Sequence, residues 1–244
     1  MKGWILCTLI SVVEETHDTR TFRFKLAHPM PFLAGQFVML SFAEGAHAEN
    51  PRSARAYSIA SSPLHQQEIE LVVRINPEGF LTPLLFDTKV GDAFRIKGPY
   101  GKFTFKEGDS SDLVFIGAGS GIAPLIGIIK YVVDADIPAR MRLIYVDKTE
   151  KDLIARTFFE RLARDGKLDL TLSVTRETNE SWKGERGRID EAKIVKLLKN
   201  KNTKEKITTR LFYICGAPAM VNDTSEFLRK QGVAPAQIRT EKYD

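Results

Sequence analysis

The chain has 244 residues, and its contents of 43% hydrophobic and 27% charged residues are typical of a globular protein and exclude a disordered one. Its two cysteines, Cys7 and Cys215, are too few for a disulfide framework, a zinc site or a cysteine-held iron–sulfur cluster, which predicts a reducing, cytoplasmic location. The net charge of +5 would suit an anionic cofactor or an acidic partner, although solvated lysines are the simpler explanation.

The chain opens with an apolar run, within MKGWILCTLISVVEETHDTR, of roughly the length of a secretion signal. One lysine precedes this run, and no cleavage site of small residues follows it. A first β-strand is therefore the better prediction. No stretch approaches the ~20 apolar residues that a membrane-spanning helix needs.

From Gly3 to Lys106, short runs rich in Val, Ile, Phe and Thr alternate with turn residues. Each run has about the length of one strand. This spacing predicts an antiparallel barrel or sandwich. The runs after the first are TRTFRFKL, GQFVMLSF, RAYSIAS, EIELVVRI and DAFRIKG.

From Asp112 onward, apolar strand runs alternate with helical patterns, which predicts βαβ units and a parallel sheet. The polar stretch KEGDSSD separates the halves, so we expect one domain over residues 1–107 and another over residues 112–244. The expected strands are LVFIG, MRLIYV, LDLTLSV and RLFYIC. The expected helices are PLIGIIKYVVDA, DLIARTFFERLARD, EAKIVKLLKN and PAMVNDTSEFLRKQ.

The stretch FIGAGSGIAP joins the first of these strands to the first helix, which is the context of a dinucleotide-binding turn. Gly119 and Gly121 let the backbone approach a pyrophosphate, which the helix start would favour. Pro124 costs little in a first helical turn. A glycine-rich structural turn is the alternative, because the GxGxxP pattern is weak evidence by itself.

In RAYSIASSP, the two-residue period of a strand places Arg55 and Tyr57 on one face and Ser58 on the other. Arg55 offers a planar fork to a phosphate, and Tyr57 offers a ring for stacking. Taken alone, the segment is better explained as a polar edge strand. A second anion site downstream would favour the binding interpretation.

The segment PEGFLTPLLFD provides such a candidate. Gly79 opens a turn, and we expect Thr82 to cap a helix that starts at Pro83. Helix capping alone is the competing interpretation. Farther along, GPYGKF is expected to form a turn next to the domain boundary.

Six short motifs occur in the order seen in the ferredoxin–NADP reductase superfamily, and the resemblance covers essentially the whole chain. They are RAYS, GFLT, GPYG, GSGIAP, CGAPAMV and TEKYD. The resemblance implies an antiparallel Greek-key β-barrel that binds flavin, followed by a Rossmann-like α/β domain that binds a nicotinamide dinucleotide. It implies hydride transfer from NADPH to bound FAD, in preference to FMN, so that the protein's main task is to align two rings and exclude water.

The resemblance also assigns roles to individual residues. It places Arg55 at the flavin diphosphate, Tyr57 on the isoalloxazine ring and Ser58 near flavin N5. The diphosphate would also be bordered by Gly79 and Thr82. The residues implied to hold the nicotinamide dinucleotide are Gly119, Gly121, Pro124 and Gly216.

Two further residues are implied to lie beside the nicotinamide, namely Cys215 and Glu241. Cys215 ends the run RLFYIC, at the carboxyl end of the expected sheet, where ligands bind in open α/β folds. A small buried core residue is the alternative for Cys215, and a solvated side chain is the alternative for Glu241.

The choice of nucleotide depends on the segment LSVTRETNESWKGERGRID. Thr175 and Arg176 end a strand, and Arg188 precedes the next helix. The pair TRE and GRI resembles that of NADPH-using bacterial ferredoxin reductases, in which two arginines grip the 2′-phosphate. We expect NADPH in preference to NADH. A surface pair of Arg176 with Glu177 or Glu185 is the alternative.

The chain ends in EKYD, which resembles a carboxyl end where an aromatic residue covers the flavin. The extra Asp244 leaves the position of Tyr243 open.

The electron acceptor is expected to be a separate molecule, namely an acidic ferredoxin, a flavodoxin or an oxygenase component. We expect neither a nucleic-acid nor a membrane partner. The lysines between Lys196 and Lys206 could dock such an acceptor, although a solvated helix end is the simpler interpretation. A flavin- and nucleotide-binding regulatory subunit with little activity of its own is the alternative function.

Overall fold

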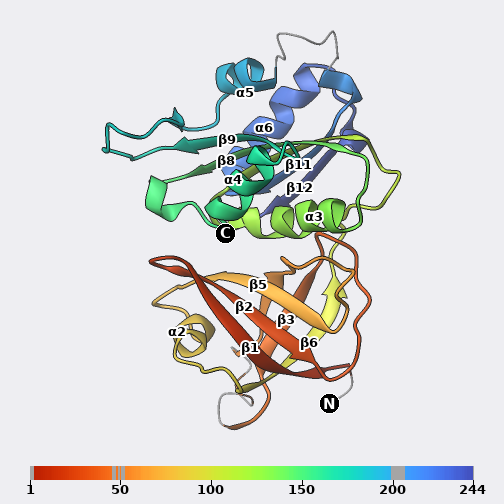
Figure 1. Cartoon of the computed structure of the whole chain (residues 1–244), viewed down its shortest axis with the longest axis vertical. Coiled ribbons are helices and arrows are strands. Elements are labelled where there is room, and N and C mark those ends of the chain that lie inside the picture. The colour runs from red at the N-terminus through yellow and green to blue at the C-terminus, as the bar shows by residue number, and fades with distance from the viewer. Residues whose placement is uncertain (1–2, 46–47, 49, 51–52, 199–206, 244) are drawn as a thin grey trace. The chain divides into compact units, whose positions relative to one another are not determined.

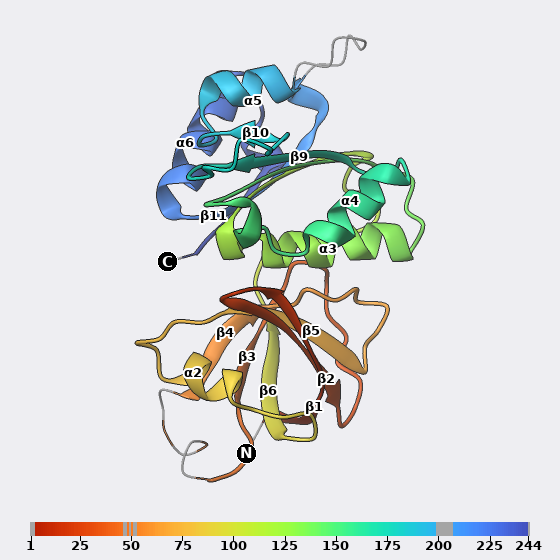
Figure 2. The same ribbon diagram turned by 60° about the vertical axis from the view of Figure 1, so that its left-hand side comes forward.

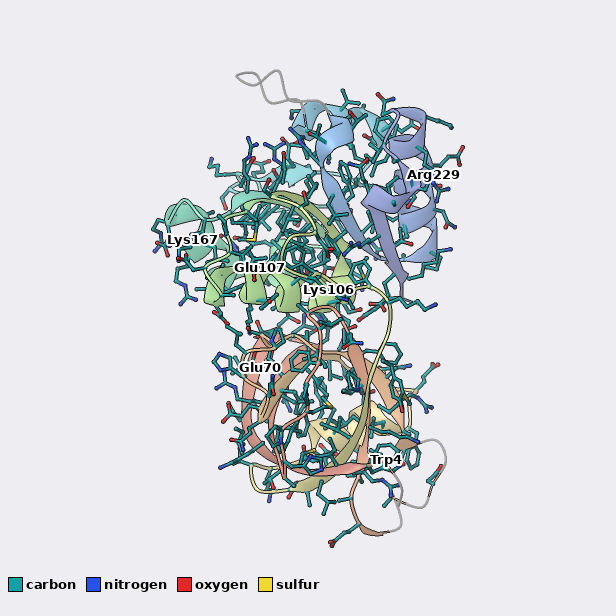
Figure 3. The ribbon with its side chains drawn as sticks, turned by 90° about the vertical axis from the view of Figure 1, so that its right-hand side faces the viewer. Trp4, Glu70, Lys106, Glu107, Lys167 and Arg229 are labelled. Carbon is teal, nitrogen blue, oxygen red and sulfur yellow. The ribbon has the colours of Figure 1, made fainter. Side chains whose placement is uncertain are left out.

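The computed structural model describes residues 3–45, 48, 50, 53–198 and 207–243. Internal contacts divide the chain into two units. The first comprises Met1–Lys106 and Ile126–Ala135, and the second comprises Glu107–Leu125 and Asp136–Asp244. Figure 3 labels Lys106 and Glu107, which flank the division between the units. The assignment of separate binding domains to residues 1–107 and 112–244 stays a prediction.

The first unit contains a six-stranded antiparallel sheet in the order β4-β3-β6-β1-β2-β5 (Figure 1). A bridge between Ile59 and Leu71, beside a hydrogen bond from Ala60 N to Glu70 O, joins β4 to β5 at the two ends of this order. The predicted antiparallel, barrel-like domain is therefore confirmed. Its strands are β1 Ile5–Thr16, β2 Thr19–Leu26, β3 Phe37–Phe42, β4 Arg55–Ser58, β5 Glu68–Arg74 and β6 Ala93–Tyr100.

The barrel forms because its strands alternate between apolar and polar residues. In β2, Phe22, Phe24 and Leu26 are buried, while Arg23 and Lys25 are exposed. The ring of Phe24 packs edge-on against Phe94 of β6, with ring centroids 5.2 Å apart. Burial of these faces against one another builds one core inside the barrel.

The apolar run near the amino terminus is β1, as predicted, and it pairs with both β2 and β6. Cys7 and Leu9 point into the core, whereas Leu6 is exposed. The expected turn over GPYGKF is wrong in its first half, because Gly98, Pro99 and Tyr100 still belong to β6. Their pairing with β3, in which Tyr100 lies opposite Phe37, continues the strand.

The second unit contains a six-stranded parallel sheet in the order β10-β9-β8-β7-β11-β12. Its strands are β7 Asp112–Ala118, β8 Arg140–Asp147, β9 Asp169–Val174, β10 Glu185–Arg186, β11 Leu211–Gly216 and β12 Ile238–Lys242. The predicted parallel sheet is confirmed. The strands β10 and β12 were not predicted, because the sequences ER and IRTEK lack an apolar run.

Helices lie on both faces of this sheet (Figure 2), namely α5 and α6 on one face, and α4 with the first turns of α3 on the other. The bounds are α3 Ile122–Asp134, α4 Arg156–Arg164, α5 Glu191–Leu198 and α6 Pro218–Lys230. Because both faces are covered, the central strands are apolar throughout rather than alternating. In β7, for example, Val114 faces the α5–α6 core, and Phe115 stacks on Tyr213 of β11 with centroids 5.6 Å apart.

Backbone packs directly on backbone where β7 leads into α3. The turn Gly119–Gly121 lies against the end of β11, and a Cβ added at Gly121 would sit 2.7 Å from both the carbonyl carbon and the carbonyl oxygen of Cys215. Neither side of this contact is a flexible side chain. A residue other than glycine would therefore force the turn and the strand apart.

We predict that Gly121→Ala destabilises the second unit by ~1–3 kcal/mol, as overpacking of a tight interior does. A thermal melt followed by circular dichroism would measure this as a lower melting temperature. Ser120→Ala is the matched control, because it alters the same turn without adding an atom, and it should melt close to the wild type. An unchanged melting temperature for Gly121→Ala would contradict the close approach.

Candidate functional site

The strand β4 presents Arg55, Tyr57 and Ser58 as the sequence predicted, on alternating faces. Arg55 is exposed, Tyr57 is half-buried against the barrel core, and Ser58 is buried. Burial raises the pKa of Tyr57 to about 12, while the positive charge of Arg55 acts in the opposite direction. A neutral ring thus lies beside a guanidinium that can reach a phosphate. The structure brings these three residues together on one strand, and their flavin contacts stay a prediction.

The expected role of Thr82 as a helix cap is wrong. The helix α2 spans Leu81–Phe86, so Thr82 lies inside it, and the residue at the cap position is Phe80. The Thr82 hydroxyl instead donates to Asn76 O at 3.0 Å and accepts from Asn76 N at 2.9 Å. This places the hydroxyl across the turn that contains Gly79, where its two hydrogen bonds hold the turn closed.

Gly79 fits a tight turn for a related reason. A Cβ added at Gly79 would lie 3.0 Å from Asn76 O and 3.3 Å from the Thr82 hydroxyl. The backbone amide of Gly79 donates to Asn76 O at 2.9 Å. Gly79 and Thr82 therefore shape one compact turn in the barrel unit, and a flavin diphosphate contact there stays a prediction.

The glycine turn lies at the carboxyl end of β7, where ligands bind in open parallel sheets. Gly119–Gly121 form a single 3₁₀ turn, and α3 follows at once with Pro124 in its first turn. The capping residue Ala118 has no side-chain oxygen that could accept hydrogen bonds from the free amides of the turn. Amides at a helix start lack intrahelical acceptors, so this turn suits an anionic pyrophosphate.

The end of β11 packs against this turn and carries the second predicted motif. Cys215 and Gly216 are the last residues of β11, and both are buried. The neighbouring strand β12 pairs Glu241 with Cys215. The two residues that the family resemblance implied to lie beside the nicotinamide are therefore neighbours. Burial raises the pKa of the Cys215 thiol well above its usual value, and the charge of Glu241 raises it further. A thiol held neutral in this way is a poor nucleophile and can act by contact alone.

The predicted phosphate arginines lie at the carboxyl edge of the same sheet. Thr175 and Arg176 follow β9 directly, and both are exposed. Arg188 lies two residues after the end of β10, whose Arg186 pairs with Val174 at the end of β9. Both arginines thus follow strands that are neighbours in the sheet, and their joint contact with a phosphate stays a prediction.

The turn before Arg188 is held by hydrogen bonds. Gly187 N donates to Val174 O at 2.8 Å, and Ser173 Oγ donates to Gly187 O at 2.8 Å. Lys193 of α5 donates from Nζ to Arg186 O at 2.6 Å and to Gly187 O at 3.1 Å. Arg188 thus extends from a fixed backbone.

The alternative, a surface pair of Arg176 with Glu177 or Glu185, is wrong. Glu177 accepts from the backbone of Glu150 at 2.7 Å, and Glu185 pairs with Lys196 at 2.8 Å. Within the described ranges, the guanidiniums of Arg176 and Arg188 have no ion pair. Both are available to an anion from solution.

Two neighbours of the site were missed by the sequence interpretation. Lys148 follows β8 and its side chain is exposed. Its backbone carbonyl accepts a hydrogen bond from Arg176 N at 2.7 Å, so the two residues are neighbours and Lys148 adds a third positive charge to this edge. Tyr145 reaches the glycine turn with its hydroxyl, 3.3 Å from Gly119 O. A tyrosine within an apolar run gives no sign of such a contact, whereas a lysine directly after a parallel strand was a usable signal.

The carboxyl-terminal Tyr243 continues beside β11, because its amide donates to Gly216 O at 3.0 Å. Its backbone is thus placed next to the Cys215–Gly216 end, and Asp244 lies outside the described residues. Of the lysine-rich segment, Lys196 pairs with Glu185. Residues 199–206 lie outside the described residues, so a docking role for this segment stays a prediction.

Across the described positions, no three or more His, Cys, Asp or Glu side chains group to hold a metal ion. The same part of the chain contains no helix both long and apolar enough to cross a bilayer.

Comparison with known families gives two matches in chain order. Residues 6–105 match the oxidoreductase FAD-binding domain, and residues 115–226 match the oxidoreductase NAD-binding domain. The first range contains β4 and the Gly79 turn, and the second contains the glycine turn, both arginines and the end of β11. Together the two matches span most of the chain.

Individual relatives agree with these matches. The reductase component of the naphthalene 1,2-dioxygenase/salicylate 5-hydroxylase systems of Ralstonia sp is 27% identical over 97% of this chain and 68% of the relative. Human cytochrome b5 reductase 4 is 33% identical over 86% of this chain, which spans 42% of that protein. The solved ferredoxin reductase in carbazole 1,9a-dioxygenase has a TM-score of 0.82 at 26% identity, and the match covers 99% of this chain and 70% of the other.

The fold, the order of the two domains and the motifs at their strand ends all agree with these comparisons. The chain therefore belongs to the ferredoxin–NADP reductase superfamily of NAD(P)H-dependent flavin oxidoreductases.

Proposed function

We propose that this chain is an FAD-dependent reductase that oxidises NADPH and passes electrons singly to a separate acceptor protein. The observation that carries the proposal is the junction at Gly121, where a glycine turn with free amides packs against the neutral thiol end of β11. This junction lies within the matched NAD-binding domain. Relatives that are reductase components of dioxygenase and monooxygenase systems support a separate acceptor.

In the barrel unit, Arg55, Tyr57 and Ser58 would hold the FAD, with the Gly79 turn as a further backbone contact. The exposed guanidinium of Arg55 suits a diphosphate, and the neutral, half-buried ring of Tyr57 suits stacking. Bound FAD would supply the chemistry that no side chain offers, namely acceptance of a two-electron equivalent and its release in single electrons. Ser58 is buried on the opposite face of β4, and its hydroxyl would donate or accept a hydrogen bond with the flavin.

In the second unit, the amides of the glycine turn would bind the pyrophosphate of the dinucleotide. Pro124 helps to start the helix whose dipole favours that negative charge. Cys215, Gly216 and Glu241 lie at the carboxyl end of the sheet and would contact the nicotinamide. Their task is to position it, since a neutral buried thiol neither attacks nor transfers a proton readily.

The acceptor class follows from the relatives rather than from a docking surface. A ferredoxin, a flavodoxin or an oxygenase component would each accept single electrons. We favour an oxygenase component or its ferredoxin, because several relatives are named as reductase components of such systems.

The proposal is tested by purifying the chain, extracting its flavin and following flavin absorbance after addition of NADPH or NADH. A yellow protein that releases FAD and is bleached by NADPH under anaerobic conditions would support the proposal. A colourless protein that cannot be reconstituted with FAD, or a bound flavin that neither nucleotide reduces, would overturn it.

The preference for NADPH rests on positive charge at the carboxyl edge. Arg176, Arg188 and Lys148 are exposed there, and a 2′-phosphomonoester with up to two negative charges suits paired guanidiniums. NADH lacks this phosphate, so it would leave these cations without a partner. The charge pattern therefore favours NADPH.

We predict that replacing both Arg176 and Arg188 by Ala lowers kcat/KM for NADPH roughly ten- to a hundredfold, because each charge-assisted contact contributes ~1.5–3 kcal/mol. The value for NADH should change little. The matched control replaces Arg164 and Arg229, two exposed arginines of α4 and α6, by Ala. An equal loss with both nucleotides would show that Arg176 and Arg188 do not read the 2′-phosphate.

We further predict that Cys215→Ser slows flavin reduction while flavin content and nucleotide affinity stay close to wild type, because a positioning contact acts on the rate of the reaction. Stopped-flow reduction by NADPH, run beside a thermal melt, measures both quantities. Cys7→Ser is the matched control, because Cys7 is equally buried but lies in the barrel core, and burial raises its pKa to about 12.

Loss of a buried thiol without a role in the reaction should lower only the melting temperature, and we expect this result for Cys7→Ser. If Cys215→Ser behaves in the same way and reduces its flavin at the wild-type rate, then Cys215 is a packing residue.

A further inference from the structure

The hydroxyl of Tyr145 lies at a junction of three backbone segments in the second unit. It is 3.3 Å from Gly119 O in the glycine turn and 3.2 Å from the Asp147 carboxylate at the end of β8. It also accepts a hydrogen bond from Ile154 N at 3.2 Å. The residue is fully buried, so these polar contacts replace water.

A phenylalanine would satisfy the packing at this position equally well. The ring of Tyr145 packs edge-on against Phe159 of α4, with centroids 6.3 Å apart, and this contact needs no hydroxyl. A buried hydroxyl costs free energy unless it is hydrogen-bonded. The presence of a hydroxyl here is therefore better explained by its hydrogen bonds than by packing of the core.

The group that it holds is the carbonyl of Gly119. That carbonyl also accepts from the amide of Ile122, so Tyr145 and the first turn of α3 fix it from two directions. Gly119 has a φ of +56°, a left-handed conformation that glycine adopts without strain. The direction of this peptide plane is thus determined by contacts beneath the turn.

Because the peptide unit between Gly119 and Ser120 is planar, the orientation of the Gly119 carbonyl also fixes the orientation of the Ser120 amide. In a trans peptide, the carbonyl of Gly119 and the amide N–H of Ser120 point in opposite directions. When the carbonyl is held toward Tyr145, the N–H of Ser120 points away from Tyr145. An amide at this point in the first turn has no acceptor within the helix.

We propose that Tyr145 is a positioning residue, which aims the Ser120 amide at the pyrophosphate of the bound dinucleotide by holding the Gly119 carbonyl. This inference rests on the proposed function, because it assumes that the glycine turn binds the nucleotide. The hydroxyl has one proton, which it shares between Gly119 O and the Asp147 carboxylate, and that carboxylate is fixed beside it because its other oxygen accepts from Lys148 N at 2.8 Å.

The test uses Tyr145→Phe in the full-length chain with its flavin, with Tyr213→Phe as the matched control. Tyr213 is equally buried in the same sheet, and its hydroxyl accepts from Arg239 Nη1 at 2.7 Å, away from the glycine turn. Binding is measured calorimetrically with two probes, 2′-phospho-ADP-ribose and 2′-AMP. Both carry the adenosine 2′-phosphate, but only the first contains a pyrophosphate.

Tyr145→Phe should weaken 2′-phospho-ADP-ribose binding roughly three- to tenfold, the loss of about one hydrogen bond, and leave 2′-AMP binding unchanged. Tyr213→Phe should bind both probes as the wild type does, although both variants lower the melting temperature. Equal weakening of both probes, or wild-type binding of both, would overturn the role of Tyr145 and leave the proposed function standing. A wild-type chain that binds neither probe would overturn the proposed function as well.

A double-mutant cycle with Ser120→Pro tests the route through the amide. Proline removes the N–H of residue 120, and a helix start tolerates proline, while the preceding glycine has no Cβ to clash with it. Ser120→Pro should weaken the pyrophosphate probe, and Tyr145→Phe should then add little further loss. Fully additive losses would show that Tyr145 does not act through Ser120. If Ser120→Pro fails to fold, the comparison of Tyr145→Phe with Tyr213→Phe decides by itself.

Discussion

The second unit depends on one steric constraint, the contact of two backbones at Gly121. The glycine turn and the end of β11 come from segments far apart in the sequence, and they meet where a Cβ would clash at 2.7 Å. This contact places free amides beside a buried thiol and its neighbouring carboxylate. The elements proposed to bind phosphate and those proposed to contact the reacting ring thereby share one edge of the sheet.

Electrostatics divides that edge into two regions. The end of β11 is buried, and its thiol stays neutral because burial and Glu241 both oppose ionisation. The ends of β8 and β9 are exposed and carry Lys148, Arg176 and Arg188. A dinucleotide has the same division, with a neutral amide-bearing ring at one end and phosphate charge toward the other. The distribution of charge along the edge therefore matches the one expected of such a ligand.

Errors in the sequence interpretation share a physical cause. Thr82 was expected to cap a helix, but its hydroxyl bonds across the Asn76 turn, and the helix begins earlier. A hydroxyl can serve the start of a helix or a neighbouring turn, and only the fold of the turn decides between them. Likewise, β12 was missed because IRTEK has no apolar run, and it becomes a strand only through pairing with β11.

The sequence by itself determined the two-part architecture, since strand runs alternate with turns in one half and with helical patterns in the other. It also located the strand ends at which Arg55, Gly119, Arg176 and Cys215 lie, because short motifs there depend on local backbone geometry. Only the tertiary structure decided which strand ends become neighbours, because sheet order brings Tyr145 to Gly119 and pairs Glu241 with Cys215, a proximity that only the family resemblance had implied. Such contacts join residues that no local pattern relates, and packing alone brings them into reach.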